Sequence, residues 1–147
     1  MDITLRPYQP EDFQALYLID QACYEPGIAY GRRELREYLG LPGSRCWVAA
    51  LGEEIVGFLI AFWGRWRAHI ITIDVVESAR RHHVGSALLA EAEREMAATG
   101  VRVVELETAT NNEPAIAFWQ KHGYQIVAIH PRYYLNRIDA YVMLKRL

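Results

Sequence analysis

The sequence predicts a mixed α/β domain with a mostly antiparallel sheet of about seven strands and four helices. Strand-like runs, either alternating or continuously apolar, recur along the chain, and helix-like runs with 3.6-residue periodicity separate them. Proline and glycine stand at the borders between these runs. The 147 residues fit one domain of ordinary size, so we expect a single domain over residues 1–147.

The first half of the chain is predicted to contain a strand, two helices and a β-hairpin. Pro7 ends the first strand, and Pro10 with two acidic residues opens a helix. Pro26 and Gly27 separate that helix from the second one. Two β-rich runs joined by a tight turn then form a hairpin. These elements span residues 2–7, 10–24, 31–40, 46–51 and 54–63.

The second half is predicted to alternate strands and helices before a final hairpin. Apolar residues recur at helical spacing from Leu88 to Met96 after Gly85, and Gly123 ends the last helix. These elements span residues 69–76, 86–100, 101–108, 112–122, 124–130 and 139–147. The order β-α-α-β-β-β-α-β-α-β-β is typical of a mixed sheet with helical crossovers.

Charge and composition exclude several classes of protein. The net charge of −2 argues against nucleic acid as a partner. The N-terminus lacks the apolar segment of a signal peptide, and no run approaches the roughly 18 residues of a membrane helix. We therefore expect a cytoplasmic protein without membrane contact. Cys23 and Cys46 lack metal-ligand spacing, and the adjacent His82 and His83 have no third ligand, so we expect no metal.

The segment Ala79–Leu89, ARRHHVGSALL, has the features of an anion-binding site. A helix start offers unpaired N–H groups and the positive end of the helix dipole. Arg80 and Arg81 add positive charge, Gly85 allows close approach, and Ser86 can cap the helix or donate. The segment lacks the motifs of a P-loop and of a dinucleotide-binding fold. A solvated basic turn before a helix is the alternative for this segment taken alone.

Four blocks in order resemble the GNAT superfamily of N-acetyltransferases over essentially the whole chain. They are ITLRPYQPEDF, EIVGF, Arg80–Gly85 and Asn112–Tyr124. The third is similar to the family signature Gln/Arg-x-x-Gly-x-Gly/Ala at its first and last positions. The fourth resembles the helix N-x-x-A-x-x-[FL]-Y-x-[KR]-x-G-[FY]. The ending, Tyr133-Tyr134 followed by DAYVM from Asp139, is similar to that of ribosomal-protein alanine acetyltransferases and archaeal N-terminal acetyltransferases.

The resemblance implies acetyl-coenzyme A as the co-substrate. In the family, the signature loop holds the pyrophosphate, the preceding strand binds the pantetheine arm, and the asparagine of the fourth block bonds to coenzyme A. The implied cofactor-binding residues are Ile73, Asp74, Val75, Arg80, Arg81, His82, His83, Val84, Gly85, Ser86, Asn112, Phe118 and Trp119.

Two positions depart from the family pattern. His83 stands where glycine is usual, and we expect that this position needs only a small side chain and no positive φ, so that the imidazole swings outward. Trp119 stands where a tyrosine commonly protonates the departing thiolate, which an indole N–H cannot do. Tyr133 or Tyr134 is the expected substitute, and Tyr134 is the candidate catalytic tyrosine.

The resemblance also implies a general base. Alternation along residues 101–108 places Glu105 and Glu107 on one face of a strand. In ribosomal-protein N-terminal acetyltransferases, a glutamate at the position of Glu107 is the proposed base, acting through water. A solvent-facing carboxylate is the alternative, and it suits Glu105 better.

Tyrosines are implied at the acceptor slot. In the similar enzymes the pair matching Tyr133 and Tyr134 borders the slot for a peptide N-terminus, and Tyr24 with Tyr30 is the candidate opposite wall. Packing is the alternative for all of them. Three functions stay open: acetylation of a protein or peptide N-terminus, acetylation of a small amine, and acyl-coenzyme A binding without catalysis. The chain is expected to be a monomer or a homodimer.

Overall fold

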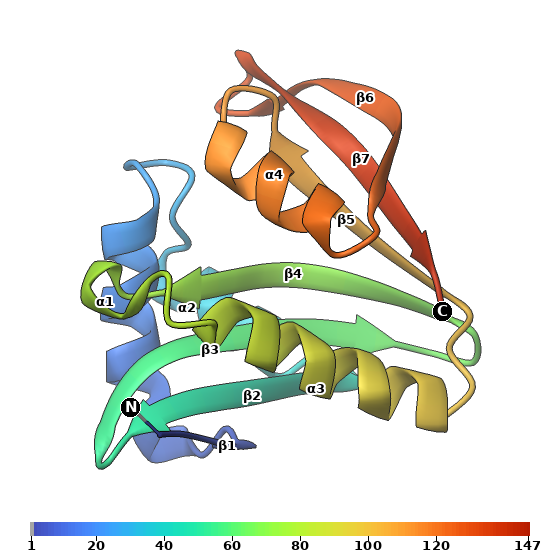
Figure 1. The fold of residues 1–147 in the computed structure, drawn as a ribbon. Helices are drawn as coiled ribbons and strands as arrows, with labels where there is room; N and C mark the ends of the chain where they lie inside the picture. The colour runs from blue at the N-terminus through green and yellow to red at the C-terminus, as the bar shows by residue number, and fades with distance from the viewer. Residues whose placement is uncertain (1) are drawn as a thin grey trace.

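The computed structural model describes residues 2–147 and contains one seven-stranded sheet with four α-helices (Figure 1). The predicted order of elements and the mostly antiparallel sheet are confirmed, with spatial order β1-β2-β3-β4-β5-β7-β6. The strands are β1 (Ile3–Pro7), β2 (Ser44–Leu51), β3 (Glu54–Trp63), β4 (Arg67–Val75), β5 (Val103–Ala109), β6 (Gln125–Tyr134) and β7 (Ile138–Arg146). The helices are α1 (Phe13–Cys23), α2 (Arg32–Leu39), α3 (Val84–Ala98) and α4 (Glu113–Lys121).

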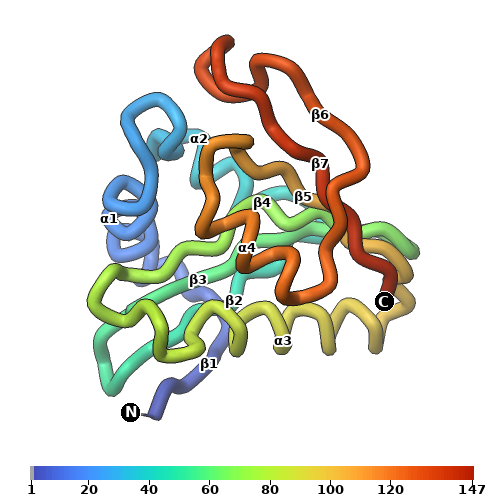
Figure 2. Tube along the Cα trace, turned by 45° about the horizontal axis from the view of Figure 1, so that its top comes forward, coloured from blue at the N-terminus to red at the C-terminus, as the bar shows by residue number. Residues whose placement is uncertain are grey.

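Helices cover both faces of the sheet (Figures 1 and 2). On one face, Leu88 and Met96 of α3 belong to the same buried cluster as Leu59 of β3. On the other face, the neighbouring Phe58 packs with Leu16 of α1 and with α2. Because successive side chains of a strand point to opposite faces, β3 can contribute to both clusters. Within residues 2–147 no helix is both long and apolar enough to span a membrane.

The last hairpin is longer than the sequence predicts. We expected the sixth strand to end at His130, but β6 continues to Tyr134 and pairs there with Ile138 of β7. The pairing register shifts between His130 and Tyr134. Pro131 lies in this irregular stretch, where the missing N–H of proline is tolerated because the strand is at the edge of the sheet.

The strands β4 and β5 pair over a short distance only. They are the parallel pair of the sheet, and their register runs from Arg67 beside Val103 to His69 beside Glu105. Beyond His69, β4 stays paired with β3 while β5 stays paired with β7, so the two strands diverge (Figure 1). Residues 71–75 of β4 therefore keep one unpaired side, which we call the open edge of β4.

The loop between β4 and α3 corrects one expectation. His83 has a φ of +62°, and Arg81 has a φ of +67°. The position of His83 therefore does require positive φ, contrary to the interpretation that only a small side chain is needed. Histidine is among the residues that adopt this region more often than most, although glycine does so at lower cost. Residues in the left-handed conformation turn the chain, so that main-chain N–H groups converge just before the helix.

This backbone conformation predicts how His83 tolerates substitution. His83→Gly should change the free energy of unfolding by less than about 1 kcal/mol, because easier positive φ is offset by a more flexible unfolded chain. His83→Val should lower it by about 1–2 kcal/mol, because a β-branched residue is strained at positive φ. Urea unfolding of the three proteins measures both changes. Equal stability of the Gly and Val variants would contradict this account of the loop.

Candidate active site

Side chains from α1 and from the following loop contact the open edge of β4. The hydroxyl of Tyr24 lies 3.4 Å from the Ile73 carbonyl oxygen, and the thiol of Cys23 lies 3.6 Å from that of Val75. Arg80 also donates from Nε to the Val75 oxygen at 3.1 Å. These carbonyls lie two residues apart and so face the same side of the strand. The edge therefore offers main-chain groups to which an extended ligand with amide groups can bond.

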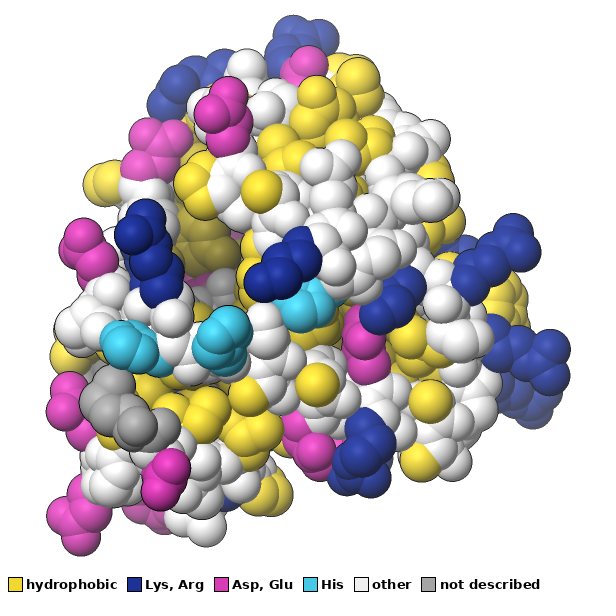
Figure 3. Space-filling model, in the orientation of Figure 1, with side chains coloured by type: hydrophobic (Ala, Val, Ile, Leu, Met, Phe, Trp, Pro, Cys, Tyr) yellow, Lys and Arg dark blue, Asp and Glu magenta, His cyan; other side chains and the backbone are white. Residues whose placement is uncertain are grey.

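The start of α3 provides an anion-binding geometry. The first hydrogen bond of the helix runs from the Ala87 N–H to the His83 oxygen at 2.9 Å. The N–H groups of Val84, Gly85 and Ser86 therefore have no acceptor within the helix. Side chains of Lys or Arg and of His gather over this loop (Figure 3). The dipole of α3 and the neighbouring guanidinium groups favour a phosphate group here.

The helix α4 packs against this loop. A Cβ placed on Gly85 would lie 3.2 Å from the Phe118 ring, so glycine permits the close approach of α3 and α4. The side chain of Asn112 accepts a hydrogen bond from the first turn of α4 at 3.3 Å, as its predicted capping role requires. The hydroxyl of Ser86 lies 3.0 Å from Nε2 of His122, so it bonds to the residue directly after α4 in this structure.

Trp119 is a packing residue in this structure. Its side chain is buried, and its ring centroid lies 5.1 Å from that of Phe118 and 5.2 Å from that of Tyr124 in edge-on arrangements. These contacts fix α4 against the sheet. A proton donor for the reaction has to be a different group.

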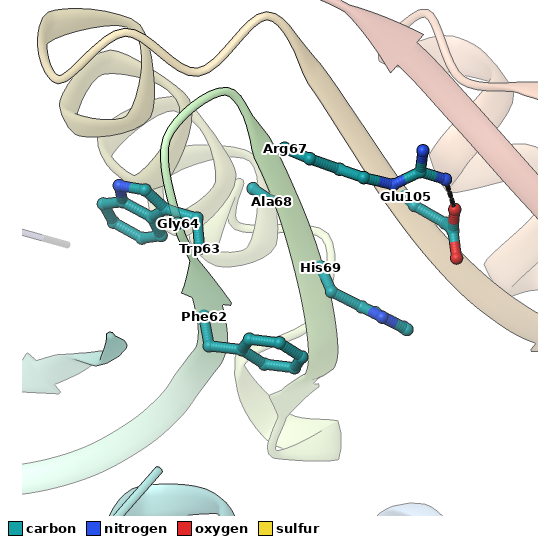
Figure 4. A pocket seen from close by; sticks show the side chains of 7 residues that line it. All are labelled: Phe62, Trp63, Gly64, Arg67, Ala68, His69 and Glu105. Carbon is teal, nitrogen blue, oxygen red and sulfur yellow. Dashed lines mark hydrogen bonds and ion pairs between the residues drawn. The ribbon is translucent and has the colours of Figure 1, made fainter. Parts of the chain in front are cut away.

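A cavity of about 210 Å³ lies on the β5 side of β4 and has mostly aromatic walls. Its polar groups include a carboxylate and an imidazole, which can interact with an amine. Its lining residues are Tyr30, Tyr38, Phe62, His69, Ile71, Glu107, Tyr133 and Tyr134. A second cavity of about 260 Å³ adjoins it and shares Phe62 and His69 (Figure 4).

Glu107 is the central acid–base group of this cavity. Its Oε1 lies 2.7 Å from Nε2 of His69, and the hydroxyl of Tyr133 donates to the same oxygen at 3.4 Å. The side chain of Glu107 is 12% exposed, so it is mostly shielded but reachable from the cavity. A carboxylate hydrogen-bonded to an imidazole can take up a proton directly or through one water.

Three tyrosines of the cavity, Tyr30, Tyr133 and Tyr134, are neutral phenols. Burial raises the pKa of Tyr133 to about 12, and the nearby Glu107 carboxylate adds to this shift. Burial likewise raises the pKa of Tyr30 and of Tyr134. All three therefore keep their protons near neutral pH. They can donate hydrogen bonds, and they are not bases.

Glu105 lies on the same face of β5 and forms an ion pair with Arg67 (Figure 4). Ligand atoms of His69, Glu105 and Glu107 lie within 4.8 Å of one another, which is a spacing that a metal ion can use. Each of these side chains already has a partner in the protein, since His69 bonds to Glu107 and Arg67 pairs with Glu105. The arrangement is therefore satisfied without an ion, and the expected absence of a metal stays a prediction.

The structure brings together most of the residues that the sequence suggested for the acceptor slot. Tyr30, Tyr133, Tyr134 and Glu107 line one cavity. Tyr24 does not line it, because its hydroxyl points to β4, 3.3 Å from Oγ1 of Thr72. The tyrosine therefore contacts the open edge of β4 instead of forming the opposite wall of the slot.

Sequence analysis missed several lining residues, above all His69. Alternation along β4 gives a usable signal, because His69 and Ile71 share one face of the strand. The missing information was the strand pairing, which places His69 beside Glu105 and thus near Glu107. Tyr38 and Phe62 also line the cavity, from α2 and β3.

Comparisons with known proteins agree with this geometry. Residues 13–124 match the model of the family described as "Acetyltransferase (GNAT) family". An N-alpha-acetyltransferase of Saccharolobus solfataricus is 26% identical over 161 residues, covering 99% of this chain and 94% of the relative.

Solved structures give the same result. Ard1 from Thermoplasma volcanium superposes with a TM-score of 0.90 and 28% identity, covering 100% of this chain and 99% of that one. The ribosomal-protein-S18-alanine N-acetyltransferase of Escherichia coli has the same fold, with a TM-score of 0.89 and 23% identity, covering 99% of this chain and 94% of that one.

The family model covers most of the chain, and the fold matches along its whole length. The resemblance to the family is confirmed, and the fold is shared with a ribosomal-protein alanine acetyltransferase. The chain belongs to the GNAT family of acetyltransferases and is an N-acetyltransferase.

Proposed function

We propose that this enzyme transfers an acetyl group from acetyl-coenzyme A to the N-terminal α-amine of a protein or peptide, with Glu107 as the general base. The observation that carries the proposal is the contact between Glu107 and His69, at 2.7 Å, inside an aromatic cavity next to the open edge of β4. This cavity offers an acceptor amine a base, while the neighbouring edge and loop offer a site for the donor.

The donor site is formed mainly by main-chain groups. The amides of residues 81–86 and the guanidinium groups of Arg80 and Arg81 hold the pyrophosphate, with the curl at His83 aiming the amides. Main-chain groups of residues 73–75 bind the pantetheine arm along the open edge of β4. Phe118 of α4 and Asn112, directly before α4, line the other side of the cofactor site.

The acceptor amine enters between the aromatic walls. Tyr30, Tyr133 and Tyr134 shield the reacting amine from bulk water and can hydrogen-bond to the peptide backbone. Glu107 accepts the proton of the amine, directly or through a water molecule, and His69 holds the carboxylate in place. The neutral amine then attacks the thioester carbonyl without a covalent enzyme intermediate.

The leaving thiolate needs little assistance. A thiol has a pKa near 8.5, so its anion is a tolerable leaving group near neutral pH. Tyr134 lines the cavity and is the proposed partner of the departing thiolate. Because its raised pKa keeps it a neutral phenol, it stabilises the anion as a hydrogen-bond donor, and the thiolate takes its proton from solvent. Trp119 at the usual tyrosine position is consistent with this substitution, since it packs in the core.

The nature of the base favours an α-amine over a lysine side chain. An α-amine of pKa near 7.8 is roughly one-tenth neutral at pH 7, whereas a lysine of pKa 10.4 is neutral about once in 2,500 molecules. The difference corresponds to about 3.5 kcal/mol of deprotonation work. A single carboxylate, with one imidazole beside it, suits the smaller task. The similar proteins support this acceptor, since the S. solfataricus relative is an N-alpha-acetyltransferase by name.

Glu107→Gln should lower kcat by about 10²–10⁴-fold and leave the Kd for coenzyme A unchanged, because the amide keeps the size of the side chain but cannot accept the proton. Steady-state kinetics and calorimetry with coenzyme A measure the two quantities. Glu105→Gln, on the same face of β5, is the matched control and should retain most of the kcat. Equal losses of turnover and of coenzyme A affinity in Glu107→Gln would reject its role as the base.

His69 should act through Glu107. His69→Ala should lower kcat by about tenfold, because the carboxylate loses the partner that orients it. In the double variant His69→Ala/Glu107→Gln, the loss should equal that of Glu107→Gln alone, because the two residues act as one unit. Additive losses in this double-mutant cycle would show that His69 acts independently of Glu107.

The acceptor class is tested with a panel of amines. Peptides that begin with Ala or Ser and have a free N-terminus should release thiol from acetyl-coenzyme A. The same peptides with a blocked N-terminus and an internal lysine should not. Free amino acids and polyamines are the second arm of the panel. Preferential turnover of the small amines would replace the proposed acceptor, and coenzyme A binding without thiol release from any amine would reject catalysis.

A further inference from the structure

Two aspartates lie completely inside the protein, next to the site but outside the cavity. Asp20 of α1 and Asp74 of β4 are 0% and 1% exposed. One oxygen of each carboxyl group accepts a hydrogen bond. The Tyr30 N–H donates to Oδ2 of Asp20 at 2.7 Å, and the Thr72 hydroxyl donates to Oδ1 of Asp74 at 2.6 Å. The other oxygens, Oδ1 of Asp20 and Oδ2 of Asp74, are buried and accept nothing from residues 2–147.

The two unpartnered oxygens belong to elements that pack together, because Cys23 and Tyr24, three and four residues after Asp20, contact Val75 and Thr72 of β4. Burial raises the pKa of Asp74 well above its ordinary value, and the neighbouring Asp20 carboxyl group raises it further. Two ionised carboxylates cannot bond to each other, because neither has a donor. A single proton between them satisfies both remaining oxygens at once. It also avoids placing two like charges side by side in the interior.

Among residues 2–147, no cation pairs with these two carboxyl groups. The neighbouring titratable groups include Cys23 of α1, Tyr24 directly after α1, and Cys46 of β2. Burial raises the pKa of all three, so they are neutral. Tyr30, also neutral, faces Asp20 from the loop after α1. Arg80 contacts the Cys23 sulfur and the Val75 carbonyl, and within residues 2–147 no cation forms an ion pair with either aspartate.

We infer that Asp20 and Asp74 share one proton and that this buried acid pair positions the open edge of β4. Asp74 donates to Asp20, Thr72 donates to Asp74, and Tyr24 donates toward Thr72 and the Ile73 carbonyl. The chain of hydrogen bonds runs from the loop before α2, through α1, to the strand. The pair lies behind the proposed donor site and is absent from the proposed chemistry.

This arrangement assigns positioning roles to Asp20 and Asp74. Asp20 accepts a hydrogen bond from the main-chain N–H of Tyr30, and the side chain of Tyr30 lines the acceptor cavity. The Ile73 carbonyl, on the open edge, is contacted by Tyr24 at the other end of the chain. The acid pair therefore connects the acceptor side of the site to the donor side. The donor-side part of the inference rests on the proposed function, whereas the shared proton does not.

The shared proton is tested by unfolding without any substrate. A raised folded-state pKa stabilises the protein fully below the unfolded-state pKa of about 3.9, and this stabilisation is lost as the pH rises toward the folded-state value. Asp74→Asn has no proton to lose, and its amide can donate to Asp20 while accepting from Thr72. Above about pH 4, the unfolding constant of the wild type should therefore rise by about tenfold per pH unit relative to that of Asp74→Asn.

The control for this titration is Asp2→Asn, at an exposed position before β1. Its unfolding constant should keep a fixed ratio to that of the wild type over the same pH range. A fixed ratio for Asp74→Asn as well would overturn the inference, since it would mean that both carboxylates are ionised in the folded protein.

Infrared spectroscopy tests the proton in the wild type, so the result does not depend on a variant that folds. At neutral pH, protein labelled with ¹³C-carboxyl aspartate should show the label-shifted C=O stretch of a protonated carboxyl group. The band should vanish at alkaline pH, and Asp74→Asn should lack it. The absence of the band in the wild type at neutral pH would overturn the inference.

The positioning role is tested by coenzyme A binding. Asp20→Ala should weaken binding by about tenfold, because it removes the end of the chain that orients β4. Asp20→Asn should recover most of the affinity, since its amide can accept from Tyr30 and donate to Asp74. Loss of affinity in Asp20→Asn equal to that in Asp20→Ala, or unchanged affinity in both, would reject positioning. Both unfolding and infrared readouts stay valid even if no peptide is acetylated.

Discussion

The early separation of β4 from β5 is the constraint on which the site depends. The two strands pair from Arg67 to His69 and then follow different partners, β3 on one side and β7 on the other. A continuous sheet would use the main-chain groups of residues 71–75 within its own ladder. Because the ladder stops, the groups that face away from β3, such as the Ile73 and Val75 carbonyls, contact within residues 2–147 only the side chains of Cys23, Tyr24 and Arg80 and can bond to a ligand. A cavity also opens between the two strands.

The same short pairing also creates the acid–base group. Parallel register places His69 beside Glu105, and the alternation of β5 places Glu107 on the same face. The imidazole and the carboxylate then meet at the point where the strands part. The proposed donor site, acceptor cavity and base thus follow from one feature of the sheet. The proposed role of the buried Asp20 and Asp74 is to hold α1 against that feature.

Local patterns predicted much of this. Alternation identified the face of Glu107, helical spacing identified the buried side of α3, and Asn112 proved to cap α4. The pairing of strands and side chains that are distant in the sequence could not be predicted from local patterns. The side chains of His69 and Asp74 give no signal of their own in the sequence until their neighbours, Glu107 and Asp20, are known. The positive φ of His83 was missed because the side chain alone argued against it, while the turn into α3 imposes it.

The central claim is that main-chain amides before α3 hold the diphosphate of coenzyme A and that the open edge of β4 holds its pantetheine arm. A crystal structure of the complex with coenzyme A tests it most directly. The account predicts diphosphate oxygens within hydrogen-bonding distance of N–H groups from residues 81–86, with the thiol end reaching the cavity beside Glu107. A nucleotide bound at another surface, with the loop before α3 unoccupied, would contradict the account.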